Sequence, residues 1–157
     1  AGPAASGKDL TGLLAEFRRS LAQQAVRAVL SRATFERPPS SGRATPVHAG
    51  PGMARPEWQV SQECPFAVRD GEAILSGQMD RLVVLRDGGR AVGADVVDFK
   101  TDAVSADDPA ALAARVDWYR PQLEAYRRAA SALLGLDAGR VSTRLVFTGP
   151  GLVVPVE

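Results

Sequence analysis

The sequence is poor in several features that mark common classes of protein. It has one cysteine, Cys64, so no disulfide can form within the chain and the fold needs no oxidising compartment. Its formal net charge of +1 provides no overall field for nucleic acid, so binding to nucleic acid would require a local patch or a partner. No apolar run approaches the roughly 18 residues of a membrane span. We therefore expect a cytoplasmic protein without a membrane partner.

The length and composition predict a single domain over residues 1–157. A chain that is 45% hydrophobic at this length can bury one core. Apolar residues recur at a spacing near 3.6 over residues 8–32, which predicts one amphipathic helix within an N-terminal part, residues 1–35. Residues 36–56 are rich in proline, glycine and serine without periodicity and predict a flexible loop. We expect residues 57–157 to form the core of the domain.

The core combines strand and helix signals. Gly88 and Gly89 form a strong hairpin signal between two runs rich in β-branched residues. Asp108 before Pro109 is typical of a helix start, and Gly135 is typical of a helix end. The predicted strands cover residues 58–68, 73–86, 90–100, 141–147 and 152–156, and the predicted helix covers residues 109–134. This order predicts an α/β fold in which a mixed β-sheet is flanked by α-helices.

Acidic residues interrupt two of the predicted strands. The stretch VVDFKTD places Asp98 and Lys100 two residues apart at the end of an apolar strand, and Asp80 interrupts the preceding strand. Burying such charges costs several kcal/mol unless they are paired or bind a metal. A three-residue hairpin loop would place Asp80 opposite Asp98, with Cβ atoms about 5 Å apart, whereas a two-residue loop would send them to opposite faces. The sequence leaves this register open.

The two aspartates form a candidate metal site if they share a face of the sheet. Like charges opposite each other destabilise a sheet, so the pair needs a cation or one carboxyl needs a raised pKa. Lys100 lies on the same face as Asp98 and supplies one positive charge. Two carboxylates with backbone oxygen and water are ligands that Mg²⁺ or Mn²⁺ prefers, and the lysine would then orient or activate a water. The alternative is a solvated strand end without a ligand.

The predicted helix adds a polar face. Tyr119, Gln122 and Tyr126 lie on one side of it, at spacings of three and four residues. Gln122 and Tyr126 are therefore neighbours that can hydrogen-bond a phosphate or a nucleic-acid backbone. The alternative is purely structural, with Tyr126 as a half-buried core aromatic and Gln122 as a surface residue.

Four short motifs occur in a fixed order along the core. They are E-C-P-F at residues 63–66, G-Q-M-D-R-L at 77–82, V-D-F-K-T-D at 97–102 and Y-R-P-Q-L-E-A-Y at 119–126. This series resembles the RecB-type nuclease module of the PD-(D/E)XK superfamily. It is most similar to the version at the C-terminal end of bacterial UvrD-like helicases such as AddA, RecB and the Adn subunits. The resemblance implies a restriction-endonuclease-like core.

The resemblance also implies a role for each matching residue. Asp80 and Asp98 would be metal ligands, with the carbonyl of Phe99 completing the protein's share. Lys100 would be the catalytic lysine of the D-x-K element. The Q-x-x-x-Y element lies near the active site and the DNA strand. The implied catalytic set is Asp80, Asp98, Lys100, Gln122 and Tyr126.

Three other positions bear on the match. Gly77 fits a glycine that permits close approach on its strand, and Glu63 belongs to a motif that we interpret as structural or as supporting the site. The family also carries a metal-ligating histidine or acid on an upstream helix. Here the first helix offers Glu16 but no histidine, and the only histidine, His48, lies in the proline- and glycine-rich segment.

The function implied by the resemblance is DNA cleavage. The chain would be a Mg²⁺- or Mn²⁺-dependent exonuclease module of an ATP-dependent helicase-nuclease that processes double-strand breaks for recombinational repair. Its partners would be DNA, a helicase motor on the same parent chain and a second helicase-nuclease subunit, so we expect the sequence to be a fragment. Two alternatives remain: a module with an incomplete metal site that binds DNA or docks a partner subunit, and a purely structural appendage.

Overall fold

The computed structural model describes residues 7–31, 33–36, 48–50 and 52–157, so residues 37–47 and 51 of the predicted loop lie outside the described residues. The strands are β1 (Pro56–Asp70), β2 (Ala73–Asp87), β3 (Arg90–Lys100), β4 (Val141–Phe147) and β5 (Leu152–Val156). The helices are α1 (Gly7–Ala22), α2 (Gln24–Leu30), α3 (Ala33–Glu36) and α4 (Pro109–Leu134), with one 3₁₀ turn, η1 (Ala138–Arg140).

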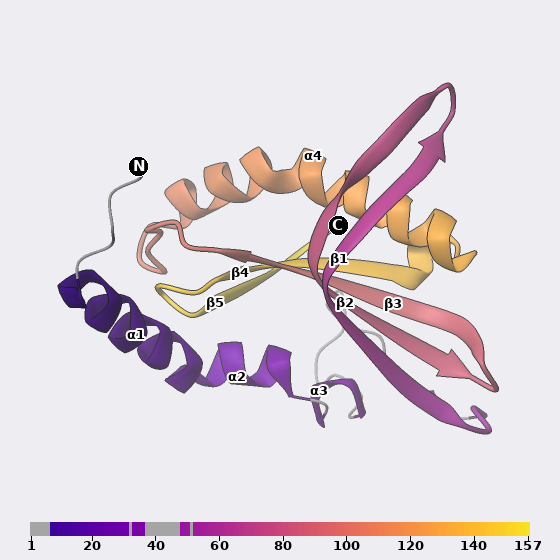
Figure 1. Ribbon diagram of the computed structural model, residues 1–157, viewed down its shortest axis with the longest axis horizontal. Helices are drawn as coiled ribbons and strands as arrows, with labels where there is room; N and C mark the ends of the chain where they lie inside the picture. Colours follow the sequence, from indigo (N-terminus) through magenta and orange to yellow (C-terminus); the bar gives the residue numbers. More distant parts are fainter. Residues whose placement is uncertain (1–6, 32, 37–47, 51) are drawn as a thin grey trace.

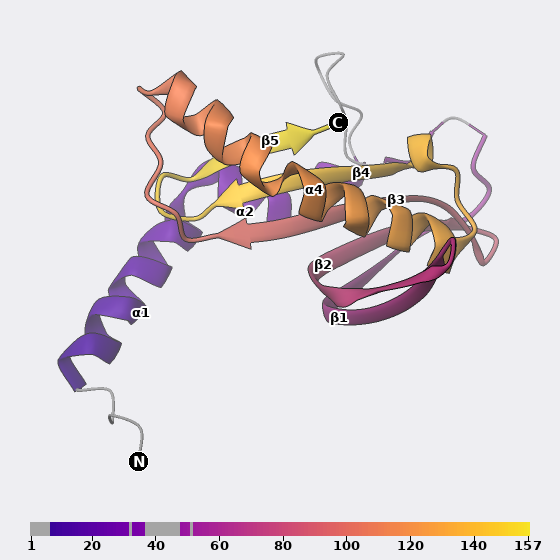
Figure 2. The same ribbon diagram turned by 90° about the horizontal axis from the view of Figure 1, so that it is seen from above.

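The five strands form one mixed sheet in the order β1-β2-β3-β4-β5. The β3–β4 pair is parallel, because the chain crosses over through α4 between these strands, and the other neighbouring pairs are antiparallel. α4 covers one face of the sheet and α2 covers the other (Figures 1 and 2). The central strands are therefore buried on both faces, which explains their continuous apolar runs. The predicted mixed sheet flanked by helices is confirmed.

The two ends of α4 follow the predicted signals. The Oδ1 atom of Asp108 accepts a hydrogen bond of 3.0 Å from the backbone N–H of Ala111, which caps the first turn. Gly135 ends the helix in the left-handed conformation, with φ of 63°. No helix among the described residues is long and apolar enough to cross a membrane.

The prediction of a single N-terminal helix is wrong in one respect. The chain breaks into α1 and α2 at Gln23, which is extended, with φ of −71° and ψ of 129°. The side chain of Gln23 donates a hydrogen bond of 2.9 Å to the carbonyl of Gly149 in the β4–β5 turn. The break lets α1 extend away from the sheet while α2 lies against it (Figure 1). The small core beneath α2 consists of Val26, Val29, Val97 and Val146.

A β-bulge sets the register between β2 and β3. The turn itself is a two-residue loop, which would place the two aspartates on opposite faces. The register then shifts beside Leu85, where Val92 on β3 lacks a partner, so that Arg81 pairs with Val97. Asp80 and Asp98 come directly after this last pair of the ladder, in the register that sets them opposite each other. The structure therefore combines the two-residue loop with the face-to-face placement that the sequence assigned to a longer loop.

The β1–β2 hairpin bends at Glu63, whose φ is +47°. Beyond the bend its outer half turns toward α4 (Figure 1), where the rings of Phe66 and Tyr126 pack edge to face with centres 5.8 Å apart. Gly77 lies directly opposite Phe66. A Cβ atom at Gly77 would lie 2.9 Å from Cζ of Phe66, so this position does permit the close approach that the sequence predicted.

We expect Gly77→Ala to lower the free energy of unfolding by about 1–3 kcal/mol, because the added methyl group displaces Phe66 from Tyr126. Gly139→Ala is a matched control, since nothing lies within 4 Å of a Cβ atom there. Urea unfolding followed by circular dichroism measures both variants. Equal stability of the two variants would contradict the close approach.

Candidate active site

The predicted site residues lie around the C-terminal end of β3. Asp98 and Lys100 come from the end of β3, and Asp80 comes from β2. Gln122 and Tyr126 come from α4, one helical turn apart. An ion pair and two hydrogen bonds connect Asp98, Lys100, Gln122 and Tyr126. A hydrogen bond to the backbone N–H of Phe99 places Asp80 beside them.

Asp98 is the most buried member of the site, with 1% of its surface exposed. Its Oδ2 atom lies 2.7 Å from Nζ of Lys100 and, apart from this ion pair, has no hydrogen-bond partner among the described residues. Burial raises the pKa of Asp98, the Lys100 ammonium lowers it, and the charge of Asp80 raises it again, so that the pKa lies above its usual value. A buried carboxylate of this kind would gain from a further cation.

Asp80 is half-buried and is fixed by the backbone of the neighbouring strand. Its Oδ2 atom accepts a hydrogen bond of 2.8 Å from the N–H of Phe99. This bond holds the carboxylate beside Phe99, the residue that follows Asp98. The two carboxylates therefore lie close enough for the charge of one to affect the pKa of the other.

Gln122 and Tyr126 are neighbours, as predicted, and they connect to Lys100. The Lys100 ammonium donates a hydrogen bond of 3.1 Å to Oε1 of Gln122, and Nε2 of Gln122 lies 2.7 Å from the hydroxyl of Tyr126. Burial of Tyr126 raises the pKa of its hydroxyl above the usual value. Here the amide of Gln122 therefore orients the lysine; its contact with a phosphate stays a prediction.

Sequence reasoning placed Tyr119 on this side of the helix but missed its contacts with Lys100 and Asp102. The Tyr119 ring lies under the Lys100 ammonium, with 4.2 Å from Nζ to the ring centre. The Tyr119 hydroxyl donates a hydrogen bond of 2.8 Å to Oδ2 of Asp102, and Nε of Arg115 lies 3.3 Å from Oδ1 of the same carboxylate. The available signal was spacing: Asp102 follows Lys100 by two residues, and Arg115 precedes Tyr119 by four.

An open groove of about 870 Å³ borders Asp80 on the side of the sheet away from α4. Its charged lining residues are Asp80, Glu63 and Arg81. The groove also reaches Phe99, whereas Asp98, Lys100, Gln122 and Tyr126 are not among the residues that line it. The remaining lining residues are Ser20, Leu21, Val26, Leu30, Gln62, Thr101, Thr148 and Gly149.

The donor set suits a hard divalent cation in part. Mg²⁺ is commonly held by one or two carboxylates, with waters and substrate phosphates in its other positions, and Asp80, Asp98 and the carbonyl of Phe99 are donors of this kind. No group of three or more His, Cys, Asp or Glu residues that could hold a metal occurs among the described residues, so His48 does not complete the set. The side chain of Glu16 lies outside the described part of the chain.

Comparison with known families identifies the superfamily of the chain. A family model of the PD-(D/E)XK nuclease superfamily matches residues 4–153. The chain belongs to the PD-(D/E)XK nuclease superfamily. A comparison with curated proteins finds no significant match. Nucleases of this superfamily generally use divalent metals, in keeping with the two facing aspartates.

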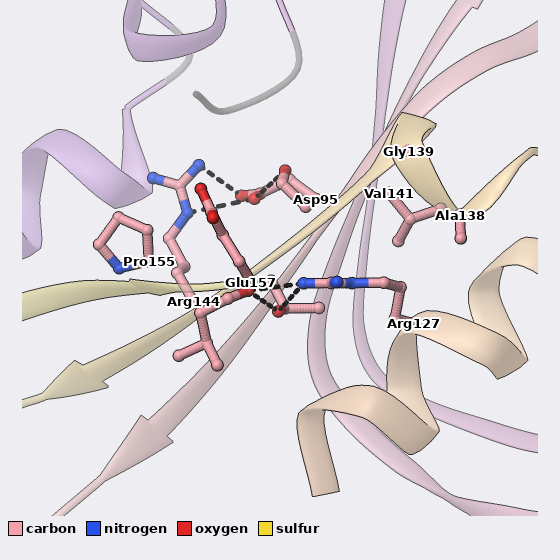
Figure 3. Close-up of a pocket in the computed structure, with 11 residues that line it drawn as sticks. Asp95, Arg127, Ala138, Gly139, Val141, Arg144, Pro155 and Glu157 are labelled. Carbon is pink, nitrogen blue, oxygen red and sulfur yellow. Dashed lines mark hydrogen bonds and ion pairs between the residues drawn. The ribbon is translucent and has the colours of Figure 1, made fainter. Parts of the chain in front are cut away.

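A separate pocket of about 410 Å³ in this PD-(D/E)XK domain lies away from the candidate site, beside β4 and β5 (Figure 3). Its deepest group is Asp95, which is fully buried and lies 2.8 Å from Nη2 of Arg144. Arg127 reaches into the pocket from α4 and donates to Thr143 and to the carbonyl of Val156 (Figure 3). Asp95 pairs with Arg144, and Arg127 is held by a neighbouring hydroxyl and carbonyl, so we assign the pocket a structural role.

We expect Mn²⁺ to bind the PD-(D/E)XK domain through Asp80 and Asp98. A cation at 100 times its Kd would stabilise the fold by about 2.7 kcal/mol, and isothermal calorimetry measures the uptake directly. Asp80→Asn and Asp98→Asn should each lose the binding, because each removes one of the two carboxylates. Asp137→Asn changes an exposed acid without a side-chain cap bond and serves as the control. Full uptake by the two site variants would exclude this metal site.

We expect Arg144→Met to lower the free energy of unfolding by about 3 kcal/mol at neutral pH, because it leaves the charge of Asp95 buried without its partner. Burial already raises the pKa of Asp95. A carboxyl with a raised pKa in the folded state destabilises the fold when ionised, so the loss should shrink as the pH falls and Asp95 becomes protonated.

Two variants control for this ion pair. Asp95→Asn combined with Arg144→Met should be more stable than Arg144→Met alone at neutral pH, because no buried charge remains at residue 95. Arg120→Met breaks an exposed ion pair with Asp117 and should cost less than about 1 kcal/mol. Unfolding curves at several pH values measure all four proteins. A pH-independent loss in Arg144→Met would contradict the assignment.

Proposed function

We propose that this PD-(D/E)XK domain is the Mg²⁺- or Mn²⁺-dependent exonuclease module of a cytoplasmic, ATP-dependent helicase-nuclease that processes DNA double-strand breaks. The observation that carries the proposal is the buried Asp98, whose Oδ2 atom has only the Lys100 ammonium as a partner among the described residues and which lies close enough to Asp80 for that charge to affect its pKa. Burying two carboxylates side by side is costly without a cation. The motif series found in the sequence supports the helicase-nuclease context.

Each side chain of the set has a role in this proposal. A divalent cation bound by Asp80 and Asp98 would polarise the phosphate and lower the pKa of the attacking water. Lys100 would offset the negative charge that develops on the phosphate. Gln122 accepts a hydrogen bond from the Lys100 ammonium and so keeps it at the end of β3. The hydroxyl of Tyr126 accepts a hydrogen bond from Nε2 of Gln122 and so helps to hold this amide in place.

The groove beside Asp80 is the proposed approach for DNA. Two of its three charged lining residues, Asp80 and Glu63, are acids. A phosphate entering the groove would be repelled unless a cation neutralised this charge. We infer that DNA and the cation bind together, and that a helicase motor on the same parent chain, with a second subunit, delivers the strand.

We expect Asp98→Ala to abolish degradation of linear DNA by the full-length protein while its circular dichroism spectrum stays unchanged. Lys100→Met should lower kcat by about 10²–10³-fold, because it removes a cation from the site of developing charge. Asp137→Ala is the matched control for loss of an acid. Undiminished cutting by Asp98→Ala would refute the catalytic role.

A second candidate is a DNA-binding module without catalysis. It is favoured by the donor set, in which no third acid, histidine or cysteine joins the two aspartates among the described residues. In that case the wild-type chain would bind labelled DNA in a filter assay, and neither it nor Asp98→Ala would cut. Metal-dependent cutting by the wild type would exclude this candidate.

A further inference from the structure

The Lys100 ammonium has contacts on several sides. Its Nζ atom lies 2.7 Å from Oδ2 of Asp98, 3.1 Å from Oε1 of Gln122 and 4.2 Å from the centre of the Tyr119 ring. The face of an aromatic ring attracts a cation, and the attraction is stronger where the cation is removed from water. The side chain of Lys100 is 15% exposed, so this contact is largely shielded.

The side chain of Tyr119 is held by contacts that involve the end of β3 as well as α4. Its hydroxyl donates to Asp102, which follows β3, and the same carboxylate pairs with Arg115. Arg115 and Tyr119 lie one turn apart on α4. The ring therefore links the end of β3 to α4, and its position under Lys100 is set by the fold rather than by the lysine.

We propose that Tyr119 is a positioning residue that holds the Lys100 ammonium against its ring face, beside Asp98. Asp102 holds the ring in turn. Lysine has a flexible four-carbon stem, so each contact narrows the volume that its ammonium samples. If a cation binds Asp98, the Lys100 ammonium keeps its contacts with Gln122 and Tyr119. The contact with the ring then contributes most to the position of the ammonium. The consequence for catalysis rests on the proposed nuclease function, whereas the placement of the ammonium does not.

The placement is measurable because the sequence has only two lysines, Lys8 and Lys100. In protein labelled with ¹³C-lysine, Lys8→Arg leaves one ε-methylene resonance, which assigns Lys100. Protons above an aromatic ring are shielded, so we expect this resonance to lie upfield of its position in the urea-unfolded protein. Tyr119→Leu should abolish the displacement, and Tyr119→Phe should retain part of it, because the ring remains although its hydrogen bond to Asp102 is lost.

Two further variants separate this contact from general disturbance of the helix. Trp118→Leu removes the adjacent aromatic side chain on α4, which is 74% exposed, and should leave the Lys100 resonance in place. Asp102→Ala frees the Tyr119 ring without removing it and should reduce the displacement. Asp102→Ala also tests the proposal if Tyr119→Leu fails to fold.

The same variants connect the placement to catalysis. With Mg²⁺ and linear DNA, we expect Tyr119→Leu to lower kcat about tenfold at unchanged KM, and Tyr119→Phe to stay within about threefold of the wild type. A merely structural role would not predict rescue by the phenylalanine ring together with a retained Lys100 shift.

The outcomes are distinguishable. An unshifted Lys100 resonance in the wild type, or a shift that survives Tyr119→Leu, overturns the placement. Full kcat in folded Tyr119→Leu, with the shift lost, overturns the positioning role. If the wild type itself does not cut DNA, the proposed nuclease function fails, and the resonance alone then decides whether Tyr119 holds Lys100.

Discussion

The approach of two carboxylates, Asp80 in the middle of β2 and Asp98 near the end of β3, is the constraint on which the site depends. Asp80 and Asp98 share a face only because the register shifts by one residue at the Val92 bulge. A shift of one residue moves every side chain of a strand to the other face. Without the bulge, Asp80 would lie across the sheet from Asp98 and Lys100, and a single cation could not bind both acids. A local irregularity far from the chemistry thus determines whether the chemistry is possible.

Much of the fold could be predicted because its signals are local. The caps at Asp108 and Gly135, the hairpin turns and the apolar strands each depend on neighbouring residues, and the structure agrees with them. The bulge could not be predicted, since a two-residue turn and a longer loop fit the same letters. The break at Gln23 depends on a hydrogen bond to Gly149, which is distant in sequence. No helix-breaking residue marks the break.

The candidate site shows the same division between local and tertiary information. Spacing alone placed Gln122 and Tyr126 together on α4, but the contacts that order them come from other elements. Phe66 packs against Tyr126 because the hairpin bends at Glu63 and Gly77 leaves room for the ring. Hydrogen bonds then connect Tyr126 to Gln122 and Gln122 to Lys100. The outer half of the β1–β2 hairpin, beyond Glu63, carries none of the predicted metal ligands. Through these contacts it nevertheless helps to hold Lys100 in position.

Local charge explains how a domain with a weak overall electrostatic field could bind a molecule as negative as DNA. The chain carries a formal net charge of +1, so long-range attraction to phosphate is small. The groove lining adds local repulsion, because its acids outnumber its one arginine. Burial of Asp98 and, to a smaller extent, the nearby charge of Asp80 disfavour the ionised site, and the raised pKa of Asp98 reflects that cost. A divalent cation would relieve this cost and reverse the local sign of charge, so binding of DNA in the proposed groove would depend on the cation more than on the surface charge of the domain.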